Sequence, residues 1–429
     1  MTTTAPAGPA VRTRARAQRR ALTVLFAAQV LSGAGLAAGV VNGALLAQDM
    51  LGSTSLAGLL GALATAGAAL AAAVVGRLSD AHGRRSGLAA GYLAGAVGSA
   101  GAVAAAVAGS SPLLFAAMVV YGAGTATNLQ ARYAGADLAA PAYRGRAVST
   151  VLVATTLGGV AGPNLAVSAG DLGAALGVPR LSGLFLVSAA AYGAAALVLA
   201  VWLRPDPLLL ARELDAAEHA AAPPAAQPGT GPGAEPGAKP AAGRRGPGVL
   251  PGALVMVVTQ LVMVAIMTMT PVHMHANGHG TAASGLVIAV HIGAMYLPAP
   301  LSGWLVDRRG PLVVAVAAGL AMLAAGVVAA TTAESTAVFA VALALLGVGW
   351  SMGLVSGTAM VTNAIPPATR ARTQGLVDVA ISAAGAGGGL ASGAVVAGAG
   401  YPLLTVGGGI LALAVVPAAV AAAGGISRR

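Results

Sequence analysis

Long apolar stretches, separated by short polar or basic segments, run through almost the whole of this sequence. A stretch of 18 or more apolar residues is long enough to cross a bilayer as an α-helix. Twelve stretches reach this length, at 21–46, 55–76, 86–108, 112–136, 147–170, 182–203, 250–272, 281–304, 311–331, 335–360, 374–397 and 401–424. The pattern therefore predicts an all-α membrane protein with twelve transmembrane helices.

The composition supports this prediction. Of the 429 residues, 57% are hydrophobic and 8% are charged, whereas soluble domains carry about 25% charged residues. The mean hydropathy is +0.83, and 62 residues are glycine, which suits closely packed membrane helices. We expect the lipid bilayer as a partner, no enzymatic activity, no cofactor and no nucleic-acid partner, despite a net charge of +11. The chain has no cysteine, which excludes disulfides and thiolate metal sites.

The apolar stretches group into two halves around a segment rich in Pro, Ala and Gly. We expect a basic tail at 1–20, a six-helix bundle at 21–204, a flexible linker at 205–249, a second six-helix bundle at 250–424 and a short tail at 425–429. Basic residues concentrate in the tails, the linker and every second connection, and such segments stay in the cytoplasm. The sequence therefore predicts a multi-pass protein of the plasma membrane with both termini in the cytoplasm.

The two halves also repeat each other. The run from Gly76 to Arg85 follows the second stretch and the run from Gly303 to Gly310 follows the eighth, with Asp80 and Asp307 227 residues apart. Pro141–Arg146 and Pro367–Arg372 match in the same way, at an offset of 226 residues. Duplicated bundles with a binding site between them are typical of transporters that work by alternating access.

The segment Gly76-Arg-Leu-Ser-Asp-Ala-His-Gly-Arg-Arg85 resembles the loop between the second and third helices of the major facilitator superfamily. The resemblance implies twelve helices in two bundles and a conformational latch made by Gly76, Asp80, Gly83, Arg84, Arg85 and, in the second half, Asp307. A carboxylate at a helix end can pair with an arginine or face the positive end of another helix. The alternative is that these residues only fix the topology.

Methionine and histidine gather in one window of the second half. Residues 263–295 hold five of the twelve Met and four of the six His. Met263 and Met267 lie one helical turn apart, as do His291 and Met295, so four donors could meet near the middle of two antiparallel helices. Thioether and imidazole without carboxylate suit Cu(I). Further donors at the outer end could capture the ion: Met269, His273, Met274 and His275.

The pairs Met263-x-x-x-Met267 and His291-x-x-x-Met295 resemble the CcoA-like bacterial copper importers of the same superfamily. This resemblance implies copper as the transported substrate, moved into the cytoplasm. A run containing Gly158, Gly162 and Pro163 is similar instead to a gating bend of drug–proton antiporters; its alternative interpretation is a packing face of small residues with a proline bend. Proton-coupled efflux of drugs or small metabolites is therefore the alternative, although the centres of the first six helices carry no acidic residue. A metal sensor or membrane enzyme is the weakest hypothesis, and a coupling ion is not identified.

Overall fold

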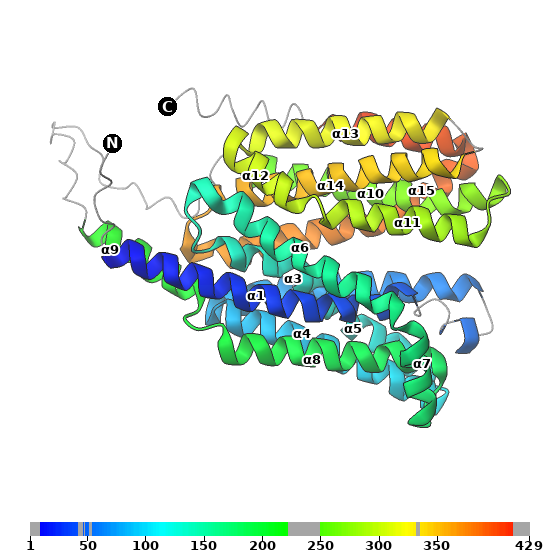
Figure 1. Ribbon diagram of the computed structural model, residues 1–429, viewed down its shortest axis with the longest axis horizontal. Helices are drawn as coiled ribbons and strands as arrows, with labels where there is room; N and C mark the ends of the chain where they lie inside the picture. The colour runs from blue at the N-terminus through cyan, green and yellow to red at the C-terminus, as the bar shows by residue number, and fades with distance from the viewer. Residues whose placement is uncertain are drawn as a thin grey trace, which may run out of the picture.

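The computed structural model describes residues 9–41, 46, 48–50, 54–221, 249–331 and 335–414. All the regular secondary structure in these residues is helical. Most helices run along the long axis of the molecule, the first half of the chain below the second (Figure 1). The ends of the predicted linker and the start of α1 lie at one end of the molecule in this view.

The first half is built from long helices joined by short turns. Its elements are α1 (Pro9–Val41), α3 (Thr54–His82), α4 (Arg84–Ala108), α5 (Ser111–Ala136), η1 (Pro141–Tyr143), α6 (Arg144–Asn164), α7 (Ala166–Ala175), η2 (Arg180–Ser182), α8 (Gly183–Trp202) and α9 (Pro207–Ala221). Helix α4 packs on α5 and α8, and α1 packs on α6 and α8. Tyr92, Tyr121 and Tyr192 form the aromatic centre of this bundle.

The second half is also built from long helices joined by short turns. Its elements are α10 (Val249–Ala276), α11 (Thr281–Tyr296), α12 (Ala299–Arg309), α13 (Pro311–Thr331), α14 (Thr336–Ala364), η3 (Pro367–Thr369) and α15 (Arg370–Ala412). Helix α14 lies against α10, α11 and α13. The repeat read from the sequence is visible here, because each of the matched segments 141–146 and 367–372 forms a short 3₁₀ turn followed by a long helix.

The predicted spans correspond to these helices with a few differences. Helix α1 begins at Pro9, so part of the expected basic tail 1–20 is helical. The spans expected at 147–170 and 281–304 are each divided, the first at Leu165 and the second at Leu297 and Pro298. The last two expected spans run together as α15, bent at Gly400, where φ is +82°.

Nine stretches of the described residues are helical, long and apolar enough to cross a membrane, and one of them, Pro367–Ala412, contains the eleventh expected span and the first half of the twelfth. Helices α1 and α6 complete the expected set of twelve. The all-α fold with two six-helix bundles is therefore confirmed. The limits expected for the bundles stay predictions, since the end of the twelfth span, 415–424, lies outside the described residues.

The prediction of a flexible linker over 205–249 is wrong for its first part, where the chain forms α9. Asp206 starts this helix: its Oδ1 accepts the backbone N–H of Leu208 at 2.9 Å and of Leu209 at 3.2 Å. Pro207 follows, and proline is favoured at the first position of a helix because its N–H would be unpaired there anyway. The rest of the expected linker, 222–248, lies outside the described residues.

The two bundles meet along two pairs of helices, α3 with α15 and α6 with α12. Glycines allow this close approach. A Cβ added to Gly76 would lie 2.8 Å from the Cα of Gly375, and one added to Gly303 would collide with Gly145 and Ser149. Gly76 and Gly303 are 227 residues apart, so the interface follows the repeat.

Candidate functional site: the inter-bundle lock and the Met/His cluster

Charged groups lie where the two bundles touch, at the end of the molecule that carries α9. We call this end, formed by residues 77–85, 137–146, 204–212, 307–311 and 363–372, the basic end. Asp307 lies at the end of α12 and faces the start of α6. Its carboxylate accepts the backbone N–H of Gly145 at 2.7 Å and of Arg146 at 3.1 Å. A carboxylate at a helix N-terminus is stabilised by the unpaired N–H groups and the helix dipole.

Asp80, the matching residue of the first half, uses an arginine instead. Arg212 of α9 donates to the Asp80 carboxylate at 2.7 Å and to its carbonyl at 2.7 Å. The same guanidinium donates to the carbonyls of Pro367 at 3.0 Å and Ala368 at 2.8 Å, just before α15. Arg212 therefore connects the end of α3 to the start of α15, and so joins the two halves.

The other predicted latch residues have separate roles. Gly83, with φ of +88°, separates α3 from α4 in a conformation that suits glycine. The backbone N–H of Arg85 donates to Asp206 at 2.7 Å. Arg84 is buried, with its side chain 1% exposed, and pairs with Asp137 at 2.8 Å. Arg84 also donates to Gln374 of α15, so this predicted latch residue contacts the other half.

Asp137 in turn lies near a second arginine, because Arg370 at the start of α15 approaches it to 3.5 Å. The corresponding contact in the other half is formed by Arg144, which donates to Asn363. Arg144 and Arg370 are 226 residues apart, as are Asp137 and Asn363. The repeat thus gives one charged contact and one neutral contact.

A buried ion pair crosses the interface deeper in the molecule. Arg132 of α5 and Asp378 of α15 lie 2.7 Å apart, with side chains 0% and 3% exposed. Arg132 also donates to Thr358 at 3.0 Å, and Tyr133 lies within 3.2 Å of the Asp378 carboxylate. Breaking a buried pair costs about 3–5 kcal/mol. The basic end is therefore closed by contacts that have to be broken before the halves separate there.

The candidate metal ligands lie in the second half. Met263 of α10 and Met295 of α11 belong to one buried cluster, and Met267 packs at its edge. Helix α14 packs on both α10 and α11, and Trp350 of α14 is part of the same cluster. Groups of three or more His, Asp or Glu that could hold a metal ion do not occur in the described residues.

His291 is fully buried on α11, one turn before Met295. Its Nδ1 lies 2.8 Å from the carbonyl oxygen of Leu343, which accepts only if Nδ1 carries the proton. The other nitrogen, Nε2, is then unprotonated. It is buried and has no hydrogen-bond partner among the described residues. It is one of ten such buried atoms in the described residues, and the only imidazole nitrogen among them.

The four residues expected to capture the ion do not form one surface. Met274 is fully buried in an apolar cluster, and Met269 packs against that cluster. His273 is stacked on Tyr401, with the ring centres 4.1 Å apart, while His275 is exposed. At the expected gating bend, helix α6 runs through Gly162 and Pro163 and ends at Asn164, and Gly158 lies against the backbone of α1 at Gly33.

Sequence reasoning missed the buried network of Arg132, Asp137, Arg370, Gln374 and Asp378. These residues join helices that are far apart in the sequence, and no local spacing marks them as partners. One signal was available, because charged residues inside a membrane helix are functional candidates by default.

The chain forms two duplicated bundles that meet along glycine-lined pairs of helices and are held together by charged contacts at one end. This architecture is that of a membrane transporter of the alternating-access class. The sequence model of the Major Facilitator Superfamily matches residues 25–389 and 252–426. The chain belongs to the major facilitator superfamily, and it is a secondary transporter.

Two relatives from Bacillus subtilis (strain 168) belong to the same superfamily. The MFS-type transporter YdeG is 50% identical over 403 residues, covering 94% of this chain and 91% of the relative. The MFS-type transporter YddS is 46% identical, covering 94% and 90%. The riboflavin transporter RfnT of Brucella anthropi is 29% identical over 249 residues, covering 58% and 56%.

Solved structures show the same fold at low sequence identity. The human organic anion transporter MFSD10 superimposes with a TM-score of 0.72 at 17% identity, over 94% of this chain and 99% of that one. The proton:xylose symporter XylE gives a TM-score of 0.72 at 15% identity, over 94% and 95%. None of these likenesses tests the copper prediction.

Proposed function

We propose that this transporter carries Cu(I) into the cytoplasm by alternating access, with Met263, Met267, His291 and Met295 as its ligands. The observation that carries the proposal is the unpaired Nε2 of His291. A metal-binding imidazole usually donates its other N–H to a carbonyl or carboxylate, which fixes the tautomer and the ring orientation. The contact between Nδ1 and the carbonyl of Leu343 has this form.

The character of the surroundings supports a soft ion. The cluster that holds Met263 and Met295 is apolar, and Trp350, Leu346 and Val355 are among its members. A doubly charged, strongly hydrated ion would lose its water there without gaining carboxylate oxygens, whereas thioether sulfur and imidazole nitrogen bind Cu(I) well. The neutral donor set therefore favours a monovalent soft cation over Mg²⁺, Ca²⁺ or Mn²⁺.

The proposed direction makes the basic end the side from which the cargo leaves. By the charge rule this end faces the cytoplasm, and the contacts of Asp307, Arg212 and Arg132 hold it shut. Cargo would then enter from the opposite side and leave after these contacts break. Transport is driven by an ion gradient or by the gradient of copper itself.

Uptake of radioactive copper by cells tests this proposal. Cells expressing the wild-type protein under copper limitation should accumulate more copper than cells without it. His291→Asn keeps an N–H donor for the Leu343 carbonyl and removes Nε2, and it should lower uptake at least tenfold. Met267→Leu should act in the same direction. Met322→Leu changes a methionine of α13 that belongs to the same buried cluster but is not one of the proposed ligands, and it should have no effect. Wild-type uptake by His291→Asn and Met267→Leu at normal protein levels would refute the proposal.

A second candidate substrate is a small organic molecule with a planar ring. The likeness to the riboflavin transporter favours it, as does an aromatic and amide group beside the Met/His cluster. There Trp350 donates to Gln260 at 2.8 Å and its ring meets Tyr296 edge to face. Radiolabelled riboflavin in the same cells separates the two candidates. Riboflavin uptake that survives His291→Asn, without copper uptake by the wild type, would identify the organic substrate.

A further inference from the structure

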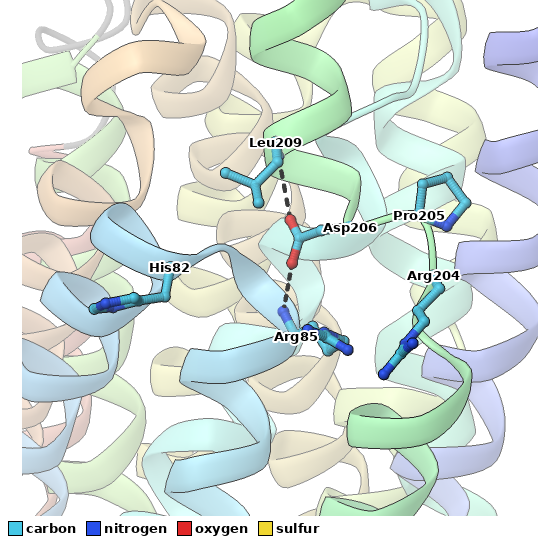
Figure 2. A pocket seen from close by; sticks show the side chains of 6 residues that line it. All are labelled: His82, Arg85, Arg204, Pro205, Asp206 and Leu209. Atoms are coloured by element: carbon cyan, nitrogen blue, oxygen red, sulfur yellow. Dashed lines mark hydrogen bonds between the residues drawn. The ribbon is translucent and has the colours of Figure 1, made fainter.

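A second polar site lies at the basic end, away from the Met/His cluster. It is an open pocket of about 290 Å³ where the ends of α3 and α8 meet the starts of α4 and α9. Its lining consists of His82, Arg85, Arg204, Pro205, Asp206 and Leu209. Figure 2 shows Asp206 hydrogen-bonded to the backbone on both sides of it, with the side chains of Arg85 and Arg204 below it in the view.

The only carboxylate in the lining is already engaged. One oxygen of Asp206 accepts the N–H of Arg85 at 2.7 Å, and the other accepts the N–H groups at the start of α9. Its charge therefore compensates the positive ends of α4 and α9. The Arg85 guanidinium makes a 3.4 Å contact with the carbonyl of Ala200. The exposed Arg204 side chain makes no hydrogen bond or ion pair within the described part of the chain. The pocket thus presents free guanidinium N–H donors.

The residues just before Arg204 show where this pocket lies relative to the bilayer. Leu197, Val201 and Trp202 on the last turns of α8 are 60%, 46% and 51% exposed. Large apolar side chains exposed at the end of a membrane helix face lipid, and tryptophan favours the level of the headgroups. Arg204 follows Trp202 by two residues, so the pocket opens at the headgroup level.

We propose that this pocket binds the phosphate of an anionic phospholipid headgroup in the leaflet on the side of α9. Two arginines can donate several charge-assisted hydrogen bonds to phosphate oxygens, and basic pockets beside membrane helices on the cytoplasmic side bind anionic headgroups. The acyl chains would lie along the exposed face of α8. The bound headgroup would hold the start of α9 against α4 and so keep Arg212 in position on Asp80. This proposal does not depend on the identity of the transported substrate.

Native mass spectrometry of the detergent-solubilised protein with added phosphatidylglycerol or phosphatidylcholine tests the proposal. The wild-type protein should retain phosphatidylglycerol in preference to phosphatidylcholine. The double variant Arg85→Gln/Arg204→Gln should bind phosphatidylglycerol about 10- to 30-fold more weakly, since each basic residue near an anionic lipid contributes about a factor of five. The matched control is Arg308→Gln/Arg309→Gln, which removes two adjacent arginines at the end of α12 and should leave binding unchanged.

Three results would overturn the proposal. Equal binding of phosphatidylglycerol by the wild type and the Arg85→Gln/Arg204→Gln variant would show that the pocket is not the site. Equal loss in the control would show that general surface charge binds the lipid. Complete displacement of phosphatidylglycerol by 10 mM (about physiological) inorganic phosphate would identify the pocket as a site for the free anion, because a lipid anchored also by its chains should resist this competition.

Discussion

The two copies of the latch both connect the two halves of the molecule, but they do so through different partners. In the second half, Asp307 binds the start of α6 directly, through the N–H groups of Gly145 and Arg146. In the first half, Asp80 reaches the region before α15 through Arg212, which comes from the segment between the bundles. The comparison teaches that duplication preserved the position of each carboxylate and the glycine beside it, while the partner changed.

The difference extends to the buried contacts next to each latch. The first half has the charged group Arg84, Asp137 and Arg370. In the second half, Asn363 stands at the position equivalent to Asp137, and Pro311 at that of Arg84. We infer that the charged copy fixes the relative position of the bundles more firmly than the neutral copy.

The largest expected effect comes from neutralising the charged copy. Asp137→Asn leaves Arg84 and Arg370 buried without a counter-charge, which should reduce the free energy of unfolding by about 3–5 kcal/mol. Asn363→Ala removes a neutral hydrogen-bond partner at an exposed contact and should cost about 1 kcal/mol. Thermal unfolding of the two purified variants in the same detergent measures both changes. Equal shifts in melting temperature would contradict the assigned difference between the copies.

A smaller loss of stability is expected from changing the interface glycines, which occupy equivalent positions in the two halves. Gly76→Ala and Gly303→Ala each place a methyl group against the opposite backbone, and overpacking typically costs about 1–3 kcal/mol. Both variants should therefore open the basic end to a similar extent. Because the chain has no cysteine, Val148→Cys, buried at the interface, can report opening by its rate of thiol labelling. Gly61→Ala, where an added Cβ meets nothing within 4 Å, is the control and should not change the rate. Faster labelling in only one of the two interface variants would show that the repeat does not set the interface.

The smallest expected change in labelling rate comes from neutralising one latch carboxylate, and its size should differ between Asp307 and Asp80. The Asp307 side chain is 5% exposed and that of Asp80 is 26% exposed. Asp307→Asn should therefore raise Val148→Cys labelling about tenfold, corresponding to about 1.4 kcal/mol, and Asp80→Asn about threefold, as expected for a partly exposed ion pair.

A double-mutant comparison sharpens this result. Adding Arg212→Gln to Asp80→Asn should raise the labelling rate by a smaller factor than Arg212→Gln does alone, because the ion pair is already broken and only the contacts of Arg212 with backbone carbonyls remain to be lost. Adding Arg212→Gln to Asp307→Asn should multiply the two single effects. Additive behaviour in both combinations would exclude Arg212 as the partner through which Asp80 acts.

The helices and the repeat could be predicted because their signals are local. Apolar length marks each span, and runs such as Gly76–Arg85 and Pro141–Arg146 recur at a fixed offset. Helix α9 could also have been predicted, since Asp206 followed by Pro207 is a helix-start signal. It was not predicted because the residues further along the linker are rich in Pro and Gly, which is typical of non-helical segments. The breaks at Leu165 and after Tyr296 also had a local signal, because Pro163 lies just before the first and Pro298 and Pro300 lie at the second.

The candidate site was predictable only in part. The Met and His pairs follow from helical spacing, which places Met263 near Met267 and His291 near Met295. Spacing could not show that His291 points one nitrogen at the carbonyl of Leu343, 52 residues away. Nor could spacing show that Met274 is buried and His275 is exposed. The face of a helix that is covered depends on the helices packed against it. The Arg132–Asp378 pair joins residues 246 positions apart and has no local signal.

The most direct test of the proposed function is the binding of Cu(I) to the purified protein, measured by competition with a coloured Cu(I) chelator. The account predicts one strongly bound Cu(I) per chain in the wild type and in Met322→Leu. His291→Asn should bind at least tenfold more weakly, and X-ray absorption of the wild-type complex should show sulfur and nitrogen ligands. Undiminished binding by His291→Asn, or a complex without sulfur ligands, would contradict the account.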